Sequence, residues 1–241
     1  MVEFDRDDAV DGRLESLLEF LELKDERRTG WVLRGVEGPE SVAAHTWGTA
    51  TLCLLYADHE AVDDAVDRSR AVEMALVHDL AEARTGDVPT RAEQGRERLS
   101  DAEKERAERE AMTALLVPFG LELEVEDAGG GVGGGGGGDD PASQSTGEDL
   151  LALWEEYERR ETPTARFVKE MDLLENCLQA LKYEREDRYE ADGDNEHFDE
   201  YDDLDEFFAT AAPRLETSFG ERLFERIRSA YEREIGRDCQ L

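Results

Sequence analysis

The stretch Leu76-Val77-His78-Asp79-Leu80-Ala81-Glu82 decides our prediction of the fold, because it sets an imidazole beside a carboxylate in an otherwise apolar run. Such groups are costly to bury unless they share a bound ion or pair with each other. His45 lies upstream and Asp172 downstream, each in an apolar helical pattern of its own. Together the four polar side chains predict a metal site of two histidines, His45 and His78, and two aspartates, Asp79 and Asp172.

The chemistry of this donor set predicts the kind of ion. Neutral imidazole nitrogens and carboxylate oxygens suit borderline divalent ions such as Mn, Co, Fe, Ni or Zn. Adjacent residues of an α-helix point about 100° apart, so His78 and Asp79 must approach an ion from different sides. Four protein ligands leave room for water and a phosphate oxygen at a six-coordinate ion. We expect a divalent cation as the cofactor, with Mn, Co or Mg favoured.

Helical periodicity extends outward from this stretch over most of the chain. A repeat of leucines, namely Leu14, Leu17, Leu18 and Leu21, predicts an amphipathic helix over about residues 11–24. Ser41 is an expected N-cap for a helix that runs through His45 to about Tyr56. Further helices are predicted over residues 67–83, 101–117, 149–160, 165–185, 201–212 and 214–235. No segment shows convincing strand alternation, so we predict an all-α fold, a multi-helix bundle around the metal site.

Local signals mark where some of these elements begin and end. Gly86 predicts the end of the helix over residues 67–83, and Pro89 prevents its restart. The run Ser100-Asp101-Ala102-Glu103 is a capping-box pattern that predicts a helix start. Residues 29–40 contain three glycines and a proline and are predicted as a loop.

A glycine-rich tract at residues 128–147 interrupts the helical pattern. Polyglycine has high backbone entropy and nothing to bury, so we predict a disordered insertion. A phosphate-binding glycine loop is rejected, because no strand precedes the tract and no Gly-Lys-Ser/Thr follows it. We expect the helical blocks on either side, together with C-terminal helices over about residues 199–236, to pack as a single domain spanning residues 1–241.

Length and cysteine content place the chain in a broad class. Its 241 residues contain no apolar run long enough to span a membrane, and the N-terminus lacks the apolar region of a signal peptide. Cys53, Cys177 and Cys239 are far apart and odd in number, which argues against a disulfide framework. We therefore expect a cytoplasmic protein.

The charge balance is extreme, with 62 acidic residues against 28 basic ones and a formal net charge of −34. Such a chain repels itself in dilute buffer, and at molar salt the Debye length falls to about 3 Å, which largely removes the repulsion. We therefore predict a protein from a halophile. The acidic residues are spread over every segment, which disfavours a nucleic-acid mimic. The same charge argues against binding to nucleic acid or to anionic membranes.

The spacing of His45, His78-Asp79 and Asp172 resembles the HD-domain superfamily of metal-dependent phosphohydrolases. The resemblance is closer to the 5′-deoxynucleotidase family, which includes bacterial YfbR-type enzymes and the eukaryotic HD domain-containing protein 2 group. It covers about residues 14 to 185 apart from the glycine tract. The segments that carry it are Gly30-Trp31-Val32-Leu33-Arg34, Pro39-Glu40-Ser41-Val42-Ala43-Ala44-His45, Ala75 to Glu82, Thr85-Gly86-Asp87-Val88-Pro89 and Leu153-Trp154-Glu155-Glu156-Tyr157-Glu158.

This resemblance implies roles for two acidic residues near the metal site. Glu82 lies three residues after Asp79 on the same helical face, and Asp87 lies in the loop that follows. Taken alone, Glu82 is typical of a helix surface and Asp87 of a turn. The resemblance implies that both act in catalysis, by proton transfer, by orienting water or, in some members, by holding a second ion. It also implies that Val88 contributes its backbone carbonyl.

The resemblance further implies that an arginine close to Trp31 orients the substrate phosphate. In the bacterial pattern the arginine directly precedes the tryptophan, whereas here Thr29 and Gly30 separate Arg28 from Trp31. Arg28 and Arg34 are therefore both candidates for substrate binding. Trp31 itself fits either a wall of the substrate pocket or the core.

The predicted function is removal of the 5′-phosphate from deoxyribonucleoside monophosphates. Alternatives are another HD-type nucleotide phosphohydrolase or phosphodiesterase, a non-catalytic metal- or nucleotide-binding protein, and an acidic interaction protein without a site. The expected partner is a small nucleotide. A homodimer is implied by resemblance, and the C-terminal aromatic residues fit either its interface or internal packing. These residues are Phe207, Phe208, Phe219 and Phe224.

Overall fold

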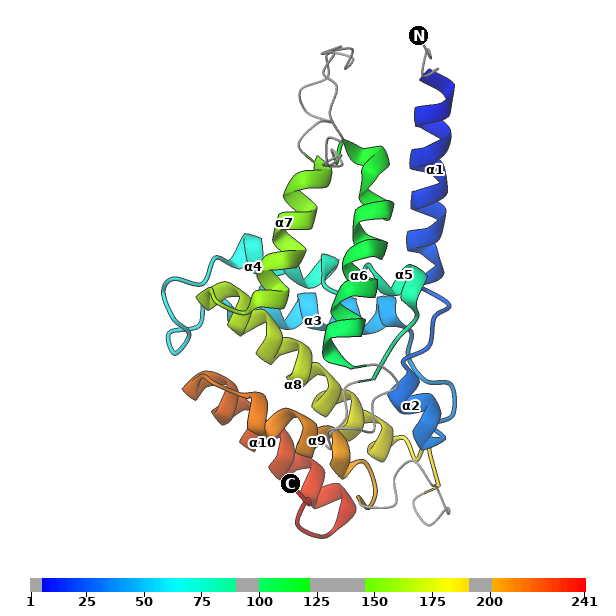
Figure 1. Cartoon of the computed structure of the whole chain (residues 1–241). Coiled ribbons are helices and arrows are strands. Elements are labelled where there is room, and N and C mark those ends of the chain that lie inside the picture. The colour runs from blue at the N-terminus through cyan, green and yellow to red at the C-terminus, as the bar shows by residue number, and fades with distance from the viewer. Residues whose placement is uncertain (1–5, 90–99, 122–145, 191–200) are drawn as a thin grey trace.

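A computed structural model describes residues 6–89, 100–121, 146–190 and 201–241 of the chain. Within these ranges the structure is helical, and no strand forms apart from an isolated bridge between Arg27 and Ser41. The all-α prediction is therefore confirmed (Figure 1). The α-helices are α1 (Arg6–Glu22), α2 (Thr29–Arg34), α3 (Val42–Tyr56), α4 (Arg68–Val77), α5 (Glu82–Thr85), α6 (Asp101–Leu116), α7 (Thr146–Arg159), α8 (Pro163–Arg185), α9 (Asp205–Ala211) and α10 (Ser218–Ile235), with the 3₁₀ turns η1 (Val117–Phe119) and η2 (Ala212–Arg214).

Helix α8 is the central element of the bundle. It packs against α3, α4 and α7 on one side and against α9 and α10 on the other. Figure 1 shows it passing diagonally between these two groups. Much of its length is buried, including Phe167, Met171, Leu174 and Cys177. Because Asp172 lies in the middle of this buried helix, the fold carries that carboxylate to the centre of the molecule.

Capping residues set the helix starts as the sequence predicts. The Ser41 hydroxyl accepts a hydrogen bond from the Ala44 amide at the start of α3. Ser100 and Glu103 form a complete capping box at the start of α6. Each cap satisfies an amide that would otherwise lack a partner in the first helical turn.

The prediction of one continuous helix over residues 67–83 is wrong, because α4 ends at Val77 and α5 begins at Glu82. The Nδ1 atom of His78 lies 2.7 Å from the Ala75 carbonyl oxygen, the group that would accept from the Asp79 amide in an α-helix. Tighter turns follow, and the Leu80 amide bonds to the Val77 carbonyl. Gly86, with φ of 70°, then ends α5 as expected.

Residues 29–40 are not a loop throughout, because the short helix α2 forms over Thr29–Arg34. A carboxylate oxygen of Asp87 accepts from the Thr29 amide at 2.5 Å and caps the first turn. Gly35 ends the helix with φ of 82°, a conformation that glycine adopts without strain. The side chain of Trp31 is fully buried against the bundle. A cap supplied from a distant loop is invisible to a local sequence pattern.

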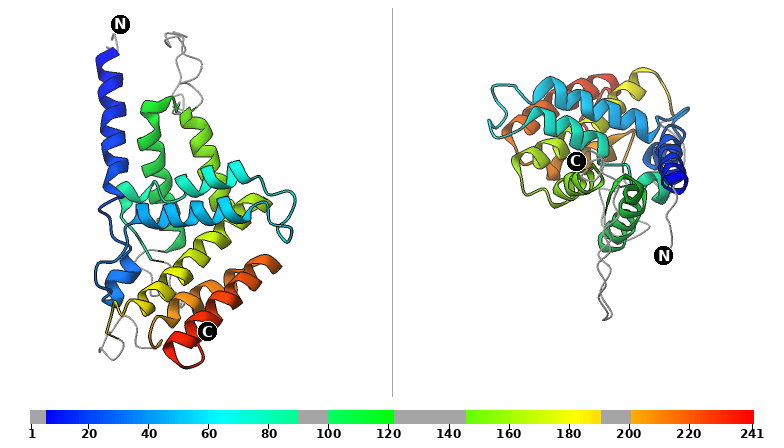
Figure 2. Two further views of the ribbon diagram at one scale, coloured as in Figure 1. Left: turned by 180° about the vertical axis from the view of Figure 1, so that it is seen from behind. Right: turned by 90° about the horizontal axis from the view of Figure 1, so that it is seen from above.

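Helix α1 forms as predicted, but its leucine stripe does not face the core. Leu14, Leu17, Leu18 and Leu21 are each about half exposed, between 48% and 51%. The helix packs on α5 and η1 through another face, on which Ser16 is buried. Figure 2 shows α1 standing at one side of the molecule and projecting beyond the bundle.

Two further expectations have partial answers. Residues 128–145 of the glycine tract lie outside the described residues, whereas Thr146 and Gly147 are the first residues of α7. In the C-terminal region, Phe208, Phe219 and Phe224 are buried and Phe207 is partly buried against the core, so these four side chains pack within the chain. All three cysteines are free thiols.

Along the described part of the chain, no helix has the length and apolarity that a membrane span requires.

Candidate metal centre

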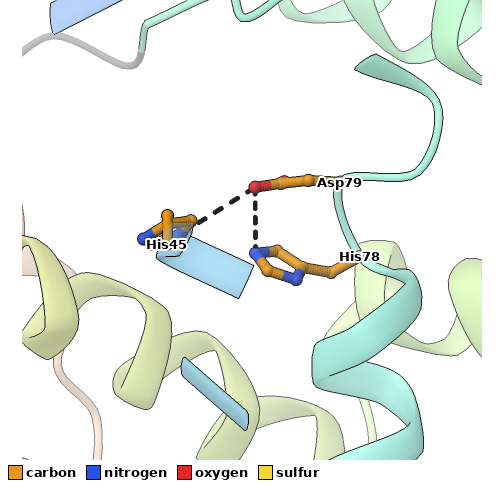
Figure 3. A group of neighbouring side chains, drawn as sticks. All are labelled: His45, His78 and Asp79. Atoms are coloured by element: carbon orange, nitrogen blue, oxygen red, sulfur yellow. Dashed lines mark ion pairs between the residues drawn. The ribbon is translucent and has the colours of Figure 1, made fainter. Parts of the chain in front are cut away.

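Three of the four predicted ligands meet at the break between α4 and α5. Donor atoms of His45, His78 and Asp79 all lie within 4.8 Å of one another. One carboxylate oxygen of Asp79 is 3.2 Å from Nε2 of His78 and 3.8 Å from Nε2 of His45. Figure 3 shows this oxygen facing both imidazoles. Because a turn replaces the helix after Val77, the side chains of the adjacent residues His78 and Asp79 can both point to the same site.

The fourth predicted ligand, Asp172, reaches the same place from α8. Its Oδ1 atom lies 3.0 Å from Nε2 of His45. Its Oδ2 atom accepts hydrogen bonds from the Tyr157 hydroxyl at 2.8 Å and from the Lys169 ammonium at 2.7 Å. Burial raises the pKa of this carboxyl, and Lys169 and His45 outweigh it, so the pKa lies well below its usual range. Asp172 is therefore held ionised.

The two histidines present the kind of donor atom that a cation needs. Nδ1 of His78 donates to the Ala75 carbonyl and Nδ1 of His45 donates to Glu175, so in the neutral imidazoles the lone pairs lie on both Nε2 atoms. Among the described residues, Nε2 of His78 is buried and has no hydrogen-bond partner. A divalent cation among His45, His78, Asp79 and Asp172 would satisfy that atom, so the residues fit the group.

Without a cation the cluster holds a proton in its place. Burial and Arg28 lower the pKa of His45, but Glu175 and Asp172 outweigh them and raise it to about 10. Nε2 of His45 therefore carries a proton at neutral pH when no metal is bound. A metal ion must displace that proton, as is general for histidine ligands.

Arg28 is the arginine that faces this cluster. Its guanidinium is 2.8 Å from Asp87 and 3.5 Å from Asp79. Burial would lower the pKa of Arg28, but the neighbouring carboxylates, Asp87 first, keep it above its usual value. Arg34 instead donates to the backbone carbonyls of Asp203 and Glu190. Of the two arginines that the sequence leaves open, the structure places only Arg28 at the cavity.

Glu82 is the carboxyl whose environment is most unusual. It is 5% exposed, and its Oε2 atom has no hydrogen-bond partner among the described residues. Burial, with the nearby charges of Asp79 and Asp87, raises its pKa well above the usual range. Asp87, by contrast, is engaged by Arg28 and by the Thr29 amide. Glu82 is therefore the better placed of the two to hold and release a proton.

A cavity opens beside these residues and extends to α9. Trp31 forms part of its wall and stacks on Phe207, with ring centroids 3.7 Å apart. Trp31 is thus both core and pocket wall. Val88 also lines the cavity, and its backbone carbonyl accepts from Lys104 at 3.2 Å. Helix α9 contributes Glu206, Phe207 and Thr210 to its wall.

Several residues of the cavity were not predicted from the sequence, namely Lys104, Tyr157, Lys169, Asn176, Glu206 and Thr210. One signal was available for the two lysines. The chain has only four lysines, Lys24, Lys104, Lys169 and Lys182, and two of them line this cavity. Because lysine is so rare in this acidic chain, each lysine was a candidate for a specific role.

Comparison with known proteins agrees with this geometry. A family model described as an HD domain matches residues 20–215. The chain belongs to the HD-domain family. This chain is 36% identical over 176 residues to the Xenopus laevis 5′-deoxynucleotidase HDDC2, and the alignment covers 70% of each chain. It is 33% identical over 184 residues to the Schizosaccharomyces pombe 5′-deoxynucleotidase hdd1, covering 73% of this chain and 77% of the relative.

The HD-domain fold is also seen in solved structures. The crystal structure of the PH0347 protein from Pyrococcus horikoshii OT3 superposes with a TM-score of 0.58 at 26% identity. That alignment covers 91% of this chain and 98% of the archaeal protein. The match of the family model through residue 215 means that α9, which lines the cavity, lies within the HD domain.

Proposed function

We propose that this chain is a metal-dependent 5′-deoxynucleotidase, which hydrolyses deoxyribonucleoside monophosphates to the deoxynucleoside and phosphate. The observation that carries the proposal is the buried cluster of His45, His78 and Asp79, which opens into a cavity beside Arg28. Relatives named as 5′-deoxynucleotidases match the chain at 33–36% identity over most of its length.

The metal ligands in this proposal are His45, His78, Asp79 and Asp172. A divalent cation bound there supplies Lewis-acid chemistry, by lowering the pKa of water and by neutralising phosphoryl charge. The hydrogen bonds of the two Nδ1 atoms hold both imidazoles with Nε2 toward the centre. Mn, Co and Mg are the ions we favour.

In this proposal Glu82 is the general acid–base residue that transfers the proton of the reaction. Burial, with the charges of Asp79 and Asp87, raises the pKa of Glu82 and so strengthens it as a base, which would accept a proton from the attacking water and pass it on to the leaving 5′-oxygen. Within the described parts of the chain its Oε2 atom has no hydrogen-bond partner, so it can bond to a water or a substrate oxygen. Asp87 acts indirectly, because it fixes Arg28 and the start of α2.

The phosphate is bound by cationic side chains on the cavity wall. Arg28 offers a planar guanidinium that suits phosphate oxygens. Lys169 stands beside Asp172 on α8, and Lys104 enters from the first turn of α6. Positioning and charge neutralisation supply most of the rate in phosphoryl transfer, so these cations are central to catalysis.

The nucleoside lies toward α9. Phe207, which stacks on the fully buried Trp31, offers aromatic surface to the cavity, and Val88 and Pro89 line it from the loop after α5. We infer that this loop lies against the sugar, where a close wall disfavours a 2′-hydroxyl. The nucleobase would then extend toward Thr210 and Glu206.

The proposed function is tested by phosphate release from a panel of deoxyribo- and ribonucleoside 5′-monophosphates, with Mn²⁺, Co²⁺ and Mg²⁺ compared in molar KCl. Cyclic nucleotides and guanosine tetraphosphate are included because other HD phosphohydrolases act on such substrates. We expect turnover of the deoxyribonucleoside monophosphates to exceed that of the others. Preferred turnover of a phosphodiester or a pyrophosphate would contradict the proposal.

We also infer the setting in which the protein works. The net charge of −34 favours a salt-rich cytoplasm, and the three free thiols suit a reducing compartment. We expect no binding to nucleic acid or to membranes, because both are anionic. The half-exposed leucines of α1 (Leu14, Leu17, Leu18 and Leu21) support a homodimer in which they pack against a second copy.

A further inference from the structure

Glu175 lies behind the candidate metal centre, on the side of His45 away from the cavity. It follows Asp172 by three residues on α8 and is 8% exposed. One carboxylate oxygen is 2.6 Å from Nδ1 of His45, whose side chain is completely buried. The other nitrogen of the same ring faces Asp172 and Asp79. The imidazole is therefore held between a carboxylate behind it and the proposed cation in front.

Gly48 makes the space that Glu175 occupies. This glycine lies three residues after His45 on α3, and a Cβ atom there would be 2.5 Å from Oε1 of Glu175 and 2.8 Å from its Cγ. Glycine inside a helix costs about 0.8–1.0 kcal/mol relative to alanine. The sequence accepts that cost at the one point of α3 where the carboxylate must pass.

We propose that Glu175 is a positioning residue for the metal centre and that Gly48 is its complement. A carboxylate accepts hydrogen bonds and cannot donate them, so it fixes the proton of neutral His45 on Nδ1 and leaves the lone pair on Nε2. It also sets the plane of the ring and increases the basicity of Nε2. The inference rests on the proposed function only in requiring that a cation binds at His45.

Glu40 lies close to the same pair, but it does not make a second cation site with them. Donor atoms of Glu40, His45 and Glu175 fall within 4.8 Å of one another. However, Oε1 of Glu40 accepts from the Trp31 indole at 3.0 Å, and Nδ1 of His45 is already bonded to Glu175. The cluster is satisfied by its own hydrogen bonds.

The same helix provides a matched control. Glu170 is also buried on α8 and fits against a glycine of another helix, because a Cβ at Gly220 of α10 would be 2.4 Å from its Oε2. Its partners are the amides of Glu216 and Thr217 and the Thr217 hydroxyl, not a histidine. Disturbing this pair perturbs the packing of α8 without touching the metal centre.

The test measures Co²⁺ affinity of the metal-free full chain by calorimetry, together with the visible absorption of the bound Co²⁺. We expect Glu175→Ala to weaken binding about 10–100-fold. Glu175→Gln should restore part of the loss, since its amide oxygen accepts the same hydrogen bond. Gly48→Ala should weaken binding by displacing the carboxylate, while Glu170→Ala and Gly220→Ala should leave the affinity unchanged. Circular dichroism checks that each variant is folded.

The outcomes separate this inference from the proposed function. Wild-type affinity in Glu175→Ala, or an equal loss in Glu170→Ala, would overturn the positioning role while leaving the metal centre intact. Loss of a second equivalent of bound Co²⁺ in Glu175→Gln would make Glu175 a direct ligand and overturn it as well. Failure of the wild-type chain to bind Co²⁺ would overturn both proposals.

Discussion

At the scale of single residues, the centre depends on how each side chain uses its second polar atom. The Nδ1–H group of His78 donates a hydrogen bond to the Ala75 carbonyl oxygen at the point where α4 ends. The same hydrogen bond orients the ring so that Nε2 faces Asp79. One hydrogen bond therefore shapes the backbone and the site together. The four proposed ligands were named from the sequence, because polar residues in apolar helical runs are conspicuous, whereas the role of Glu82 was predicted only through the family resemblance. The role of Glu175 was not predicted, because one more acid on an acidic chain carries no signal.

Glu82→Gln is expected to lower kcat about 10²–10⁴-fold, because the amide cannot carry the proton of the reaction. Bound metal, measured by elemental analysis, should stay at the wild-type level. Glu73→Gln changes an exposed glutamate of α4 and is the control. Loss of metal in Glu82→Gln would show that Glu82 is a ligand, and unchanged kcat would exclude it from proton transfer.

At the scale of elements, helices with local signals were predictable and their interruptions were not. Ser41 and the box of Ser100 and Glu103 begin α3 and α6 as expected, since a cap and its amide lie within one turn. The short helix α2 was missed because its cap comes from Asp87, more than fifty residues along the chain. The break after Val77 was missed because periodicity continues through it while the hydrogen bonds do not.

Gly147→Ala is expected to destabilise the fold by about 1–3 kcal/mol, because the added methyl overpacks a buried contact. A Cβ there would lie 2.9 Å from the Leu116 carbonyl oxygen and 2.9 Å from the Leu121 amide nitrogen. Backbone atoms cannot swing aside as a side chain can. The measurement is urea unfolding, with Gly12→Ala as the control, since a Cβ at Gly12 makes only ordinary contacts with Pro118. Equal stability of the two variants would contradict the close packing of α7 on η1.

At the scale of the whole molecule, charge and the leucine stripe of α1 are two features that a single folded chain does not explain. The chain carries −34 charges, while its cavity gathers Arg28, Lys104 and Lys169. The sequence revealed the leucines Leu14, Leu17, Leu18 and Leu21 but not the side of α1 that packs. An amphipathic pattern identifies an apolar face and leaves open whether its partner is the same chain.

Thermal stability is expected to rise steeply with KCl, because screening removes the self-repulsion of the acidic surface. Most of the rise in Tm, followed by circular dichroism, should occur below about 1 M, where the Debye length has already fallen to about 3 Å. A Tm that does not change between 0.1 M and 1 M KCl would contradict the inferred adaptation to salt.

The double variant Leu14→Glu with Leu18→Glu is expected to be monomeric, whereas the wild type should elute in molar KCl with twice the 27.1 kDa mass of one chain. Two buried carboxylates facing their copies across the interface would repel each other and lose their hydration. Light scattering after size exclusion gives the mass. Leu54→Glu with Leu55→Glu, on the exposed face of α3, is the control. A wild-type monomer would remove the proposed role of the stripe.

The most direct test of the central claim is phosphate release from dAMP by chelator-treated protein, before and after Mn²⁺ is restored, for the wild type and for Asp79→Asn. Because Asp79 is the residue that faces both imidazoles, we predict that the wild type loses turnover on chelation and regains it with Mn²⁺, and that Asp79→Asn stays inactive in both states. Turnover that persists in the chelated wild type or in Asp79→Asn would contradict a metal-dependent reaction at this site.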